Sequence, residues 1–286
     1  MLVQDILNKA ARNFADAGIP TPRLDAEILL ACCLDCDRID FIKNPKAPVD
    51  EKTLAIFQRL AARRLAWEPV AYITGRKEFW SFVLEVNSSV LIPRPDTEVL
   101  VEEALNVYRQ LGLAKIRILD IGTGSGAVAL ALACEIPAAR LTATDISAAA
   151  LATARRNARN LQLEQQIEFL QGDLLEPVDG FFDIIVSNPP YIAEEEYDKL
   201  PAGVKNYEPA AALRAGIGGL DFYRKIVAAA LGYLKNNGWL LLETGSNQST
   251  QIVDIFDSSG QYSDISIRND YAGLPRVIKA RRKISG

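Results

Sequence analysis

The sequence predicts an α/β fold: a doubly wound parallel sheet, preceded by a small all-α domain and a β-hairpin linker. Three observations lead to this prediction. Apolar side chains recur at helical spacing from Val3 to about Trp67. After residue 95, short apolar runs alternate with helix-like segments, as the strands of a parallel sheet covered on both faces do. A glycine-rich turn joins the first of these runs to an Ala-rich helix.

Residues 1–73 are predicted to form the helical domain. Ile6, Ala10 and Phe14 share one face of a first helix, and Pro22 starts a second because its fixed φ suits the first helical position. A third helix is expected to follow the capping segment at residues 48–52. Its apolar stripe would consist of Leu54, Ile56, Phe57, Leu60 and Leu65.

Residues 74–94 are predicted to be the hairpin linker, because aromatic and β-branched residues gather there before the polar segment 87–89. Residues 95–286 are predicted to form the α/β domain. Its strands are expected near residues 116–120, 140–144, 166–170, 182–187 and 238–243. Ligands of such sheets bind at the carboxyl ends of the strands, so the chemistry is expected there.

The composition of the 286 residues excludes several classes of function. A chain without histidine cannot use a histidine base, a Ser-His-Asp triad or a histidine-ligated metal. Cys33 and Cys36 have metal or redox spacing, but they lie in an apolar helical stretch without a second ligand pair, so core packing without a metal is expected. No apolar run approaches the ~20 residues that span a bilayer, and no signal-peptide core is found. A cytoplasmic protein without membrane contact is expected.

The formal charge of −4 gives no indication of a nucleic-acid partner. A protein that holds a duplex is expected to have a basic face, because neutralising phosphates supplies most of the non-specific affinity. Residues 1–73 instead carry ten Lys or Arg against ten Asp or Glu. The basic cluster Arg281-Arg282-Lys283 is interpreted as a solvated tail.

Asn188-Pro189-Pro190-Tyr191 follows the apolar run 182–187 and predicts a rigid polar turn at a strand end. Two consecutive prolines fix φ and remove two backbone donors, which leaves carbonyl groups to accept hydrogen bonds. A planar NH2 group fits such a turn, because Asn188 Oδ1 and a backbone carbonyl, that of Pro189, can accept its hydrogens while Tyr191 lies against its face. The alternative interpretation is an ordinary Pro-Pro turn with Tyr191 as a buried anchor.

Gly122-Thr123-Gly124-Ser125-Gly126 predicts a ligand-binding turn, because glycines let a bound molecule approach the main chain. The spacing only approximates the dinucleotide fingerprint. Asp145 ends the next strand about 20 residues later, where an acidic side chain reaches both ribose hydroxyls of a nucleoside. A helix N-cap is the alternative for this residue. Asp173, followed by Leu174, comes after a third strand and is placed to accept a hydrogen bond from an adenine amine.

In order and spacing these elements resemble the S-adenosylmethionine-dependent amino-methyltransferases, which implies a Rossmann-like class I methyltransferase fold. Further segments closely resemble the protein-(glutamine-N5) methyltransferases that modify peptide chain release factors, and the likeness covers nearly the whole chain. Those segments are Pro22–Glu27, Gly75–Trp80, Leu91–Glu98, Ser187–Ile192 and Asp270–Ile278. Asn-Pro-Pro-Tyr alone is shared by many nucleic-acid amino-methyltransferases, whereas its combination with residues 91–98 is specific. Some relatives carry an aromatic residue where this chain has Leu174, so adenine stacking is not supported there.

The resemblance implies an enzyme that transfers a methyl group from S-adenosylmethionine, with S-adenosylhomocysteine as product, to N5 of the glutamine in the Gly-Gly-Gln motif of a release factor. Asn188, Pro189 and Tyr191 would be catalytic and, with Pro190, would bind the substrate. The helical domain would recognise that substrate, and a monomer is expected. The residues expected to bind the cofactor are Gly122, Thr123, Gly124, Ser125, Gly126, Asp145, Asp173, Leu174 and Asn188.

Two further polar residues have expected roles near the cofactor. Asp120 would either orient the glycine loop, which is favoured, or reach the cofactor ammonium through water. Thr97 would either cap its helix or bind the cofactor carboxylate.

Three other functions fit part of the pattern. An N6-adenine or N2-guanine methyltransferase would use the same turn on a flipped base, but the balanced charge of the helical domain argues against it. A nicotinamide-dependent oxidoreductase would leave residues 188–191 without a purpose. A non-catalytic nucleotide-binding module would not need acceptors at that strand end.

Overall fold

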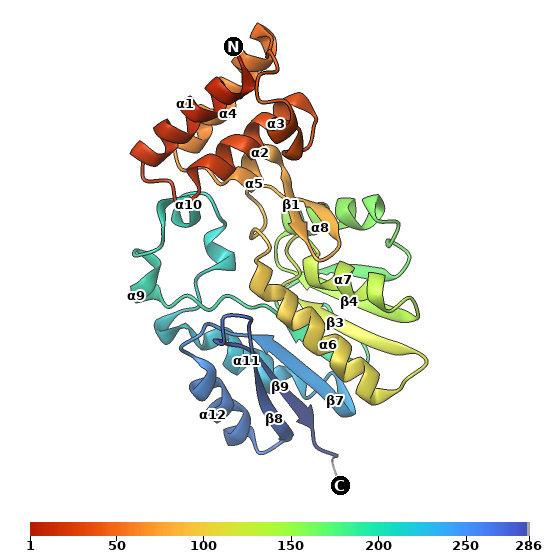
Figure 1. Ribbon diagram of the computed structural model, residues 1–286. Coiled ribbons are helices and arrows are strands. Elements are labelled where there is room, and N and C mark those ends of the chain that lie inside the picture. The colour runs from red at the N-terminus through yellow and green to blue at the C-terminus, as the bar shows by residue number, and fades with distance from the viewer. Residues whose placement is uncertain (285–286) are drawn as a thin grey trace. The chain divides into compact units, whose positions relative to one another are not determined.

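The chain folds into two compact units (Figure 1). The computed structural model describes residues 1–284, so the predicted end of the α/β domain at residue 286 lies outside the described residues. The helical unit comprises Met1–Arg76 and Pro201–Tyr207. The α/β unit comprises Lys77–Leu200 and the chain from Glu208 onward. No pattern in the sequence indicated that a short late segment joins the helical unit.

The helical unit consists of α1 (Val3–Asp16), α2 (Pro22–Leu34), α3 (Ile39–Lys43), α4 (Glu51–Leu65), α5 (Val70–Thr74) and α10 (Ala202–Lys205). Ile6, Ala10 and Phe14 are buried on one face of α1, as predicted. They belong to one apolar cluster with Leu29 and Leu30 of α2. The core of the helical unit therefore lies between α1 and α2, and residues of α3, α4 and α5 complete it.

The buried face of α4 differs from the prediction. Phe57 is buried, but Leu65 is 38% exposed and Arg64 is buried beside it. Arg64 Nε donates to Oδ2 of the buried Asp25 over 2.7 Å. Apolar periodicity cannot reveal an ion pair of this kind, because its two members lie on different helices.

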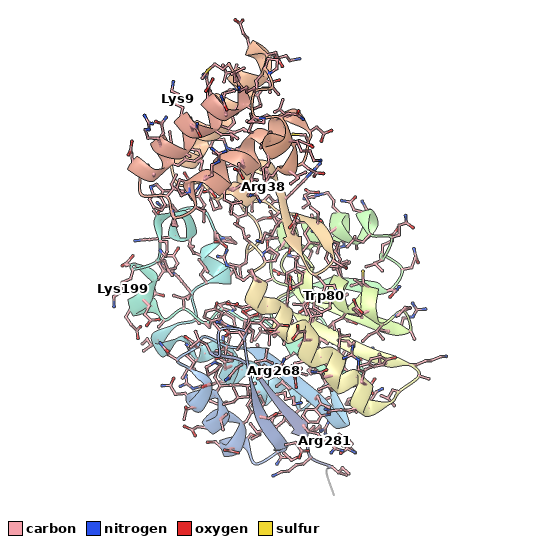
Figure 2. All side chains as sticks on the ribbon, viewed as in Figure 1. Lys9, Arg38, Trp80, Lys199, Arg268 and Arg281 are labelled. Atoms are coloured by element: carbon pink, nitrogen blue, oxygen red, sulfur yellow. The ribbon has the colours of Figure 1, made fainter. Side chains whose placement is uncertain are left out.

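The expected hairpin consists of β1 (Arg76–Phe79) and β2 (Phe82–Glu85). Trp80, labelled in Figure 2, follows β1 with a φ of 56°. Its backbone N–H donates to Glu98 Oε1 and its indole Nε1 donates to Glu135 Oε1, each over 2.8 Å. These bonds attach the hairpin turn to two helices of the α/β unit.

Within residues 1–284, one seven-stranded sheet has the order β5-β4-β3-β6-β7-β9-β8. Its strands are β3 (Ile116–Ile121), β4 (Ala139–Asp145), β5 (Ile167–Gln171), β6 (Phe182–Ser187), β7 (Leu234–Glu243), β8 (Tyr262–Asn269) and β9 (Pro275–Arg282). The strands from β3 to β7 pair in parallel and correspond to the five predicted strands. β9 runs antiparallel to both β7 and β8.

β8 and β9 were not predicted. β8 is an edge strand with largely polar, exposed side chains and two irregularities of register, so it shows no clear apolar alternation. The interpretation of the basic cluster as a solvated tail was wrong. Arg281, labelled in Figure 2, and Arg282 end β9. Arg281 pairs with Asp264 at 3.5 Å, and Lys283 Nζ donates to the Gly260 carbonyl over 2.8 Å.

Helices cover both faces of the sheet. They are α6 (Glu98–Leu111), α7 (Ala127–Glu135), α8 (Ala148–Asn160), α11 (Asp221–Ala230) and α12 (Ser249–Ser259). The short α9 (Glu194–Tyr197) packs instead against the 3₁₀ turn Ile217–Gly219, and further 3₁₀ turns lie at Pro95–Thr97 and Ala210–Ala212. Leu119 and Ile121 alternate along β3 and join the cluster that contains Tyr223 of α11 and Phe256 of α12. α6 packs against α7 and against β6, β7 and β9, and it crosses the sheet in Figure 1.

The carboxyl ends of β3 and β6 lie side by side at the centre of the sheet. The chain proceeds from β3 through β4 to β5 on one side and from β6 to β7 on the other, so the topological switch point lies between β3 and β6. Ile121 is the register partner of Ser187, and Ser187 Oγ donates to the Ile121 carbonyl over 2.8 Å. The glycine turn and the Asn-Pro-Pro-Tyr turn therefore start from adjacent points.

Neither a membrane helix nor a metal cluster is found in the described part of the chain. No helix within residues 1–284 has both the length and the apolar character needed to cross a membrane. Cys33 and Cys36 are half-buried and pack against the helical core. Over the same residues, no group of three potential metal ligands occurs.

Arg64→Ala is expected to lower the free energy of opening of the helical unit by about 3 to 5 kcal/mol, because it leaves a buried carboxylate without its positive partner. Native-state hydrogen exchange of the amides of α2 and α4 measures this change. Arg59→Ala, at an exposed position of α4, is the control and should change it by about 0.5 kcal/mol or less. Equal protection of these amides from hydrogen exchange in the two variants would contradict a stabilising role of the Arg64–Asp25 ion pair.

Candidate functional site

The glycine turn joins β3 to α7 with a backbone that glycine adopts without strain. The φ angles of Gly122 and Gly124 are +73° and +57°. A Cβ on either residue would meet no atom within 4 Å, so backbone conformation and not crowding requires glycine there. The N–H groups of Gly122 and Thr123 both donate to the Thr144 carbonyl over 2.9 Å, which holds the turn to the end of β4.

Asp120 supports this turn from within the fold. The residue is 2% exposed, and its Oδ2 accepts a hydrogen bond from Thr123 Oγ1 over 2.7 Å. Burial raises the pKa of Asp120 to about 6, the Thr123 bond opposes that rise, and the charge of Asp145 adds to it. The contact provides the loop support expected from the sequence.

The Asp145 carboxylate joins the glycine turn to the start of α8. Oδ2 accepts from the Gly124 N–H and Oδ1 from the Ser147 N–H, each over 2.9 Å. Burial raises the pKa of Asp145, and these two hydrogen bonds oppose the rise. The N-cap alternative was wrong, because Ser147 caps α8 by accepting from the Ala150 N–H over 3.1 Å. Each carboxylate oxygen keeps a second lone pair for a ligand hydroxyl.

Asp173 and Leu174 follow β5 at the same edge of the sheet. Leu174 has a φ of 50°, and its carbonyl accepts from Thr144 Oγ1 over 2.9 Å. Its side chain packs against the apolar cluster of the sheet. Within residues 1–284, the Asp173 carboxylate accepts no hydrogen bond, so its oxygens are available to a donor.

The Asn188 side chain is held on one side only. Its Nδ2 donates to Thr97 Oγ1 over 3.2 Å. Among the described residues, neither Asn188 Oδ1 nor the carbonyl oxygen of Pro189 has a hydrogen-bond partner. Thr97 makes no capping bond to α6, so the capping alternative for Thr97 was wrong. The end of β6 thus presents two acceptors next to one another in sequence.

Tyr191 is anchored through its backbone and its ring. Its carbonyl accepts from Gln248 Nε2 over 2.9 Å. Its ring packs against the apolar cluster, and burial raises the pKa of its hydroxyl, with the charge of Glu243 adding to the rise. These contacts fit the alternative of a buried anchor, and a stacking role for Tyr191 stays a prediction.

A cavity of about 290 Å³ at the switch point brings most of the predicted residues together. Those that border it are Gly122, Thr123, Gly124, Ser125, Asp145, Asp173, Leu174, Asn188 and Pro190. Gly126, Pro189 and Tyr191 do not. A Cβ on Gly126 would lie 3.0 Å from Leu130 of α7 and 3.3 Å from Ala154 of α8, so a larger residue would crowd the start of α7.

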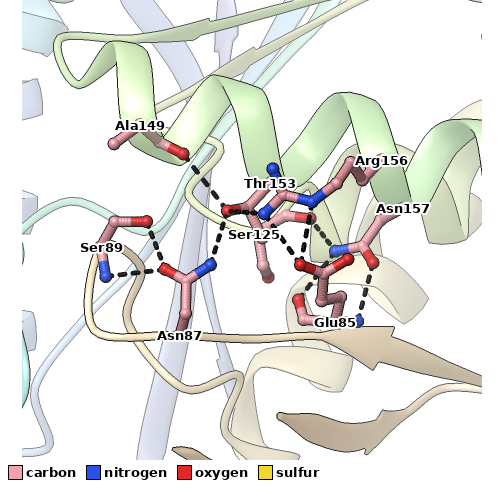
Figure 3. A network of polar contacts seen from close by, with 8 residues as sticks. All are labelled: Glu85, Asn87, Ser89, Ser125, Ala149, Thr153, Arg156 and Asn157. Carbon is pink, nitrogen blue, oxygen red and sulfur yellow. Dashed lines mark hydrogen bonds and ion pairs between the residues drawn. The ribbon is translucent and has the colours of Figure 1, made fainter.

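A polar network fixes the linker beside the glycine turn (Figure 3). Asn157 Oδ1 accepts from the Glu85 N–H over 2.7 Å, and Nδ2 donates to the carbonyls of Glu85 and Ser125 over 3.0 and 2.9 Å. Asn87 Nδ2 donates to Thr153 Oγ1 over 3.0 Å. Neither Asn157 nor Asn87 was predicted to have this role. For Asn157 the available signal was a polar residue on the inward face of an Ala-rich helix.

Ion pairs hold two of the segments quoted for the family resemblance. Arg94 borders the cavity and pairs with the buried Glu208, which the sequence did not single out. Arg276 pairs with Asp270 at 3.1 Å and with Asp96 at 3.3 Å. Arg276 lies beside the carboxyl end of β7, since its Nη1 donates to the Thr244 carbonyl over 3.3 Å, and the charges of both arginines lower the pKa of Glu243.

Two family models match the chain. The model described as "PrmC N-terminal domain" matches residues 5–75, and the "Methyltransferase small domain" matches residues 96–202. Three curated relatives are each named release factor glutamine methyltransferase. The relative from Moorella thermoacetica is 41% identical over 284 residues, which cover 99% of both chains. The one from Nitratidesulfovibrio vulgaris is 40% identical, covering 99% of this chain and 96% of the relative. The Coxiella burnetii relative is 43% identical over 92% of each.

Solved structures share the fold. A methyltransferase from Pyrococcus furiosus matches 79% of this chain and 100% of its own with a TM-score of 0.54 at 19% identity. The hMettl16 catalytic domain matches 79% of this chain and 83% of its own with a TM-score of 0.58 at 17% identity. These likenesses agree with the predicted Rossmann-like class I methyltransferase fold. Because the identity to the curated relatives extends over nearly its full length, the chain belongs to the release factor glutamine methyltransferase family.

Proposed function

We propose that this enzyme methylates N5, the side-chain amide nitrogen, of the glutamine in the Gly-Gly-Gln motif of peptide chain release factors, using S-adenosylmethionine. Beyond family membership, one observation carries the proposal: within residues 1–284, Asn188 Oδ1 and the Pro189 carbonyl have no hydrogen-bond partner. A primary amide has two N–H hydrogens, and two acceptors match them. The proposal includes a cytoplasmic monomer that contacts neither nucleic acid nor membrane.

The cavity suits S-adenosylmethionine in its size and its polar groups. Asp145 would accept from the ribose hydroxyls with its remaining lone pairs, and Asp173 from the adenine amine. Gly122 and Gly124 would let the methionine part approach the backbone, since nothing lies where their side chains would be. Thr123 and Ser125 would line the same wall, and Leu174 would contact the adenine end.

The chemistry assigned to the turn is the activation of a poor nucleophile. When bound, S-adenosylmethionine supplies an electrophilic methyl group. The lone pair of an amide nitrogen is delocalised into its carbonyl. By accepting both N–H hydrogens, Asn188 and Pro189 would favour a pyramidal nitrogen, aim it, and stabilise the positive charge that develops on it. No histidine base is needed, because the charged nitrogen is acidic and loses its proton after transfer.

The helical unit is proposed to recognise the release factor. Its residues 1–73 carry ten Lys or Arg against ten Asp or Glu, and Arg76 and Lys205 add only two positive charges, which disfavours a nucleic acid as the partner. Between α1 and α4 it has a hollow of about 230 Å³ with mostly apolar walls, a feature into which a protein partner can pack a side chain. Its apolar lining includes Ile6, Ala10, Phe14, Leu54, Phe57 and Leu65.

The direct test of the function is a labelling experiment. The purified protein is incubated with radiolabelled S-adenosylmethionine and, separately, with a release factor, stripped DNA or stripped RNA. Label is expected on the release factor alone, and peptide mass spectrometry should locate it on the Gly-Gly-Gln glutamine. Label on DNA or RNA instead would replace the proposal by the nucleic-acid methyltransferase alternative.

Asn188→Ala is expected to lower kcat by about 10²- to 10³-fold, because it removes one acceptor from the developing charge. The dissociation constant of S-adenosylmethionine should change far less. Asn160→Ala, at an exposed position away from the cavity, is the control and should keep wild-type kcat. An Asn188→Ala enzyme with most of its kcat would rule out the assigned role.

Asp145→Ala is expected to weaken S-adenosylmethionine binding by about 1 to 3 kcal/mol, since it removes the ribose acceptor and frees the N–H groups of Gly124 and Ser147. Isothermal titration calorimetry measures the change. Asp257→Ala, on the exposed face of α12, serves as the control. Identical titrations for Asp145→Ala and the wild type would refute the ribose assignment.

Leu65→Glu is expected to raise KM for an intact release factor about tenfold, by placing a charge in the apolar hollow. KM for a short Gly-Gly-Gln peptide should stay unchanged. Leu24→Glu is a matched control, because Leu24 is 37% exposed, close to the 38% of Leu65, and does not line the hollow. Equal effects of both variants, or of Leu65→Glu on both substrates, would count against recognition by this hollow.

A further inference from the structure

Glu243 is a buried acid that the proposed chemistry leaves without a role. It ends β7, and its neighbour Leu242 is the register partner of Ser187 at the end of β6. The residue is 1% exposed, and within residues 1–284 its Oε2 has no hydrogen-bond partner. The Glu243 carbonyl accepts a hydrogen bond from the Tyr223 hydroxyl over 2.9 Å. This bond satisfies the backbone of Glu243 but leaves its side-chain carboxyl without an assigned partner. Burying a carboxyl oxygen without a hydrogen-bond partner lowers the stability of the folded state. Buried acids with a shifted pKa occur often at functional sites.

The carboxyl of Glu243 reaches Asn188 through one residue. Its interaction with the hydroxyl of Thr97 lowers the pKa of Glu243, which places the two side chains next to one another. Thr97 is 4% exposed, and its Oγ1 accepts from Asn188 Nδ2 over 3.2 Å. Side chains from β7, from the start of α6 and from the Asn-Pro-Pro-Tyr turn therefore form one line of contacts.

The single hydrogen of a threonine hydroxyl gives this line a direction. When Glu243 accepts that hydrogen, Thr97 has only lone pairs left for Asn188. Nδ2 must then face Thr97, and Oδ1 faces the other way. If Thr97 instead donated its hydroxyl hydrogen to Asn188, the Asn188 amide would rotate so that Oδ1 faced Thr97 and Nδ2 faced the substrate. The N–H donors of Nδ2 would then meet the N–H donors of the substrate amide.

We propose that Glu243 and Thr97 are positioning residues that set the rotation of the Asn188 amide, so that an acceptor faces the substrate. The proposal rests on the proposed function only for the identity of that substrate. The rotation itself follows from the hydrogen-bond inventory of the three side chains. An amide turned the wrong way would lose one of the two acceptors on which the site depends.

Protonation of Glu243 should reverse the rotation. Burial raises the pKa of Glu243 to about 7, the Thr97 contact and the charges of two arginines oppose the rise, and Asp96 adds to it. Burial also raises the pKa of both nearby tyrosines, which therefore stay neutral in this range. The titratable groups that interact electrostatically with the carboxyl are Arg276 of β9, Asp96 and Arg94 ahead of α6, Tyr191 of the turn and Tyr223 of α11.

The sign of the effect follows from the hydrogen on the carboxyl. A protonated Glu243 donates to Thr97 and leaves the threonine hydrogen for Asn188. The productive rotation is therefore present above about pH 7 and lost as the pH falls through that value. Two measurements test this, one without turnover and one with it.

The first measurement follows the side-chain amide of Asn188 by ¹H–¹⁵N NMR in the full chain labelled at asparagine. The signal is assigned by its absence in Asn188→Ala. Between about pH 5.5 and 8.5 it should shift with a midpoint near 7 in the wild type and not in Glu243→Gln. Glu103→Gln is the matched control, because Glu103 is also buried yet pairs with Lys279 away from the cavity, and it should keep the shift.

The second measurement is methyl transfer to the release factor. Thr97→Val should lower kcat by about 10- to 100-fold with little change in the dissociation constant of S-adenosylmethionine, since loss of positioning acts on the chemical step. Thr97→Ser, which keeps the hydroxyl, should restore kcat to within about threefold. Thr142→Val, a buried threonine that does not border the cavity, controls for the loss of a hydroxyl. Glu243→Gln should abolish the acid limb near pH 7.

Two results would overturn the inference: an Asn188 signal that titrates alike in the wild type and Glu243→Gln, or a Thr97→Val enzyme with kcat within about twofold of the wild type. A wild-type protein that labels nucleic acid instead of release factor would remove the proposed function. The NMR titration would still decide the rotation in that case, because it uses no substrate.

Discussion

The parallel pairing of β3 with β6 is the constraint on which the site depends. Ile121 lies opposite Ser187, and the Ser187 hydroxyl bonds to the Ile121 carbonyl. A shift of this register by one residue would send every side chain of β6 to the other face of the sheet. The glycine turn and the Asn-Pro-Pro-Tyr turn would then no longer start from adjacent points. The shape of the cavity is thus fixed by strand pairing before any ligand contributes.

Several acidic side chains of the α/β unit hold the loops in which they lie. Asp120 accepts from Thr123, Asp145 from two backbone N–H groups, and Asp270 Oδ1 from the N–H groups of Ala272 and Leu274. Each bond removes freedom from a loop that borders or supports the cavity. A site built this way has its shape set in advance, which lowers the entropic cost of binding and orienting a ligand.

Much of the fold and part of the site could be predicted from the sequence, because the signals were local. Apolar runs marked the five parallel strands, and glycine spacing marked the turn after β3. The misses involve residues far apart in sequence: Arg64 pairs with Asp25 across 39 residues, and Asn188 meets Thr97 across 91. β8 and β9 were not predicted, because their amino-acid composition does not indicate strands. They are strands because they pair with one another in the folded sheet. The roles of the site residues stay predictions.

Pro201–Tyr207 packs in the helical unit although it comes after most of the sheet in sequence. The Tyr207 hydroxyl donates to the Ala66 carbonyl over 2.7 Å, and a Cβ on Gly203 would lie 2.9 Å from the Trp67 carbonyl. The polypeptide therefore passes between the two units three times, after Arg76, Leu200 and Tyr207. During synthesis on the ribosome, the first-made helices must wait for this late segment before their packing is complete. For the same reason, recombination cannot exchange the helical unit as a single contiguous cassette.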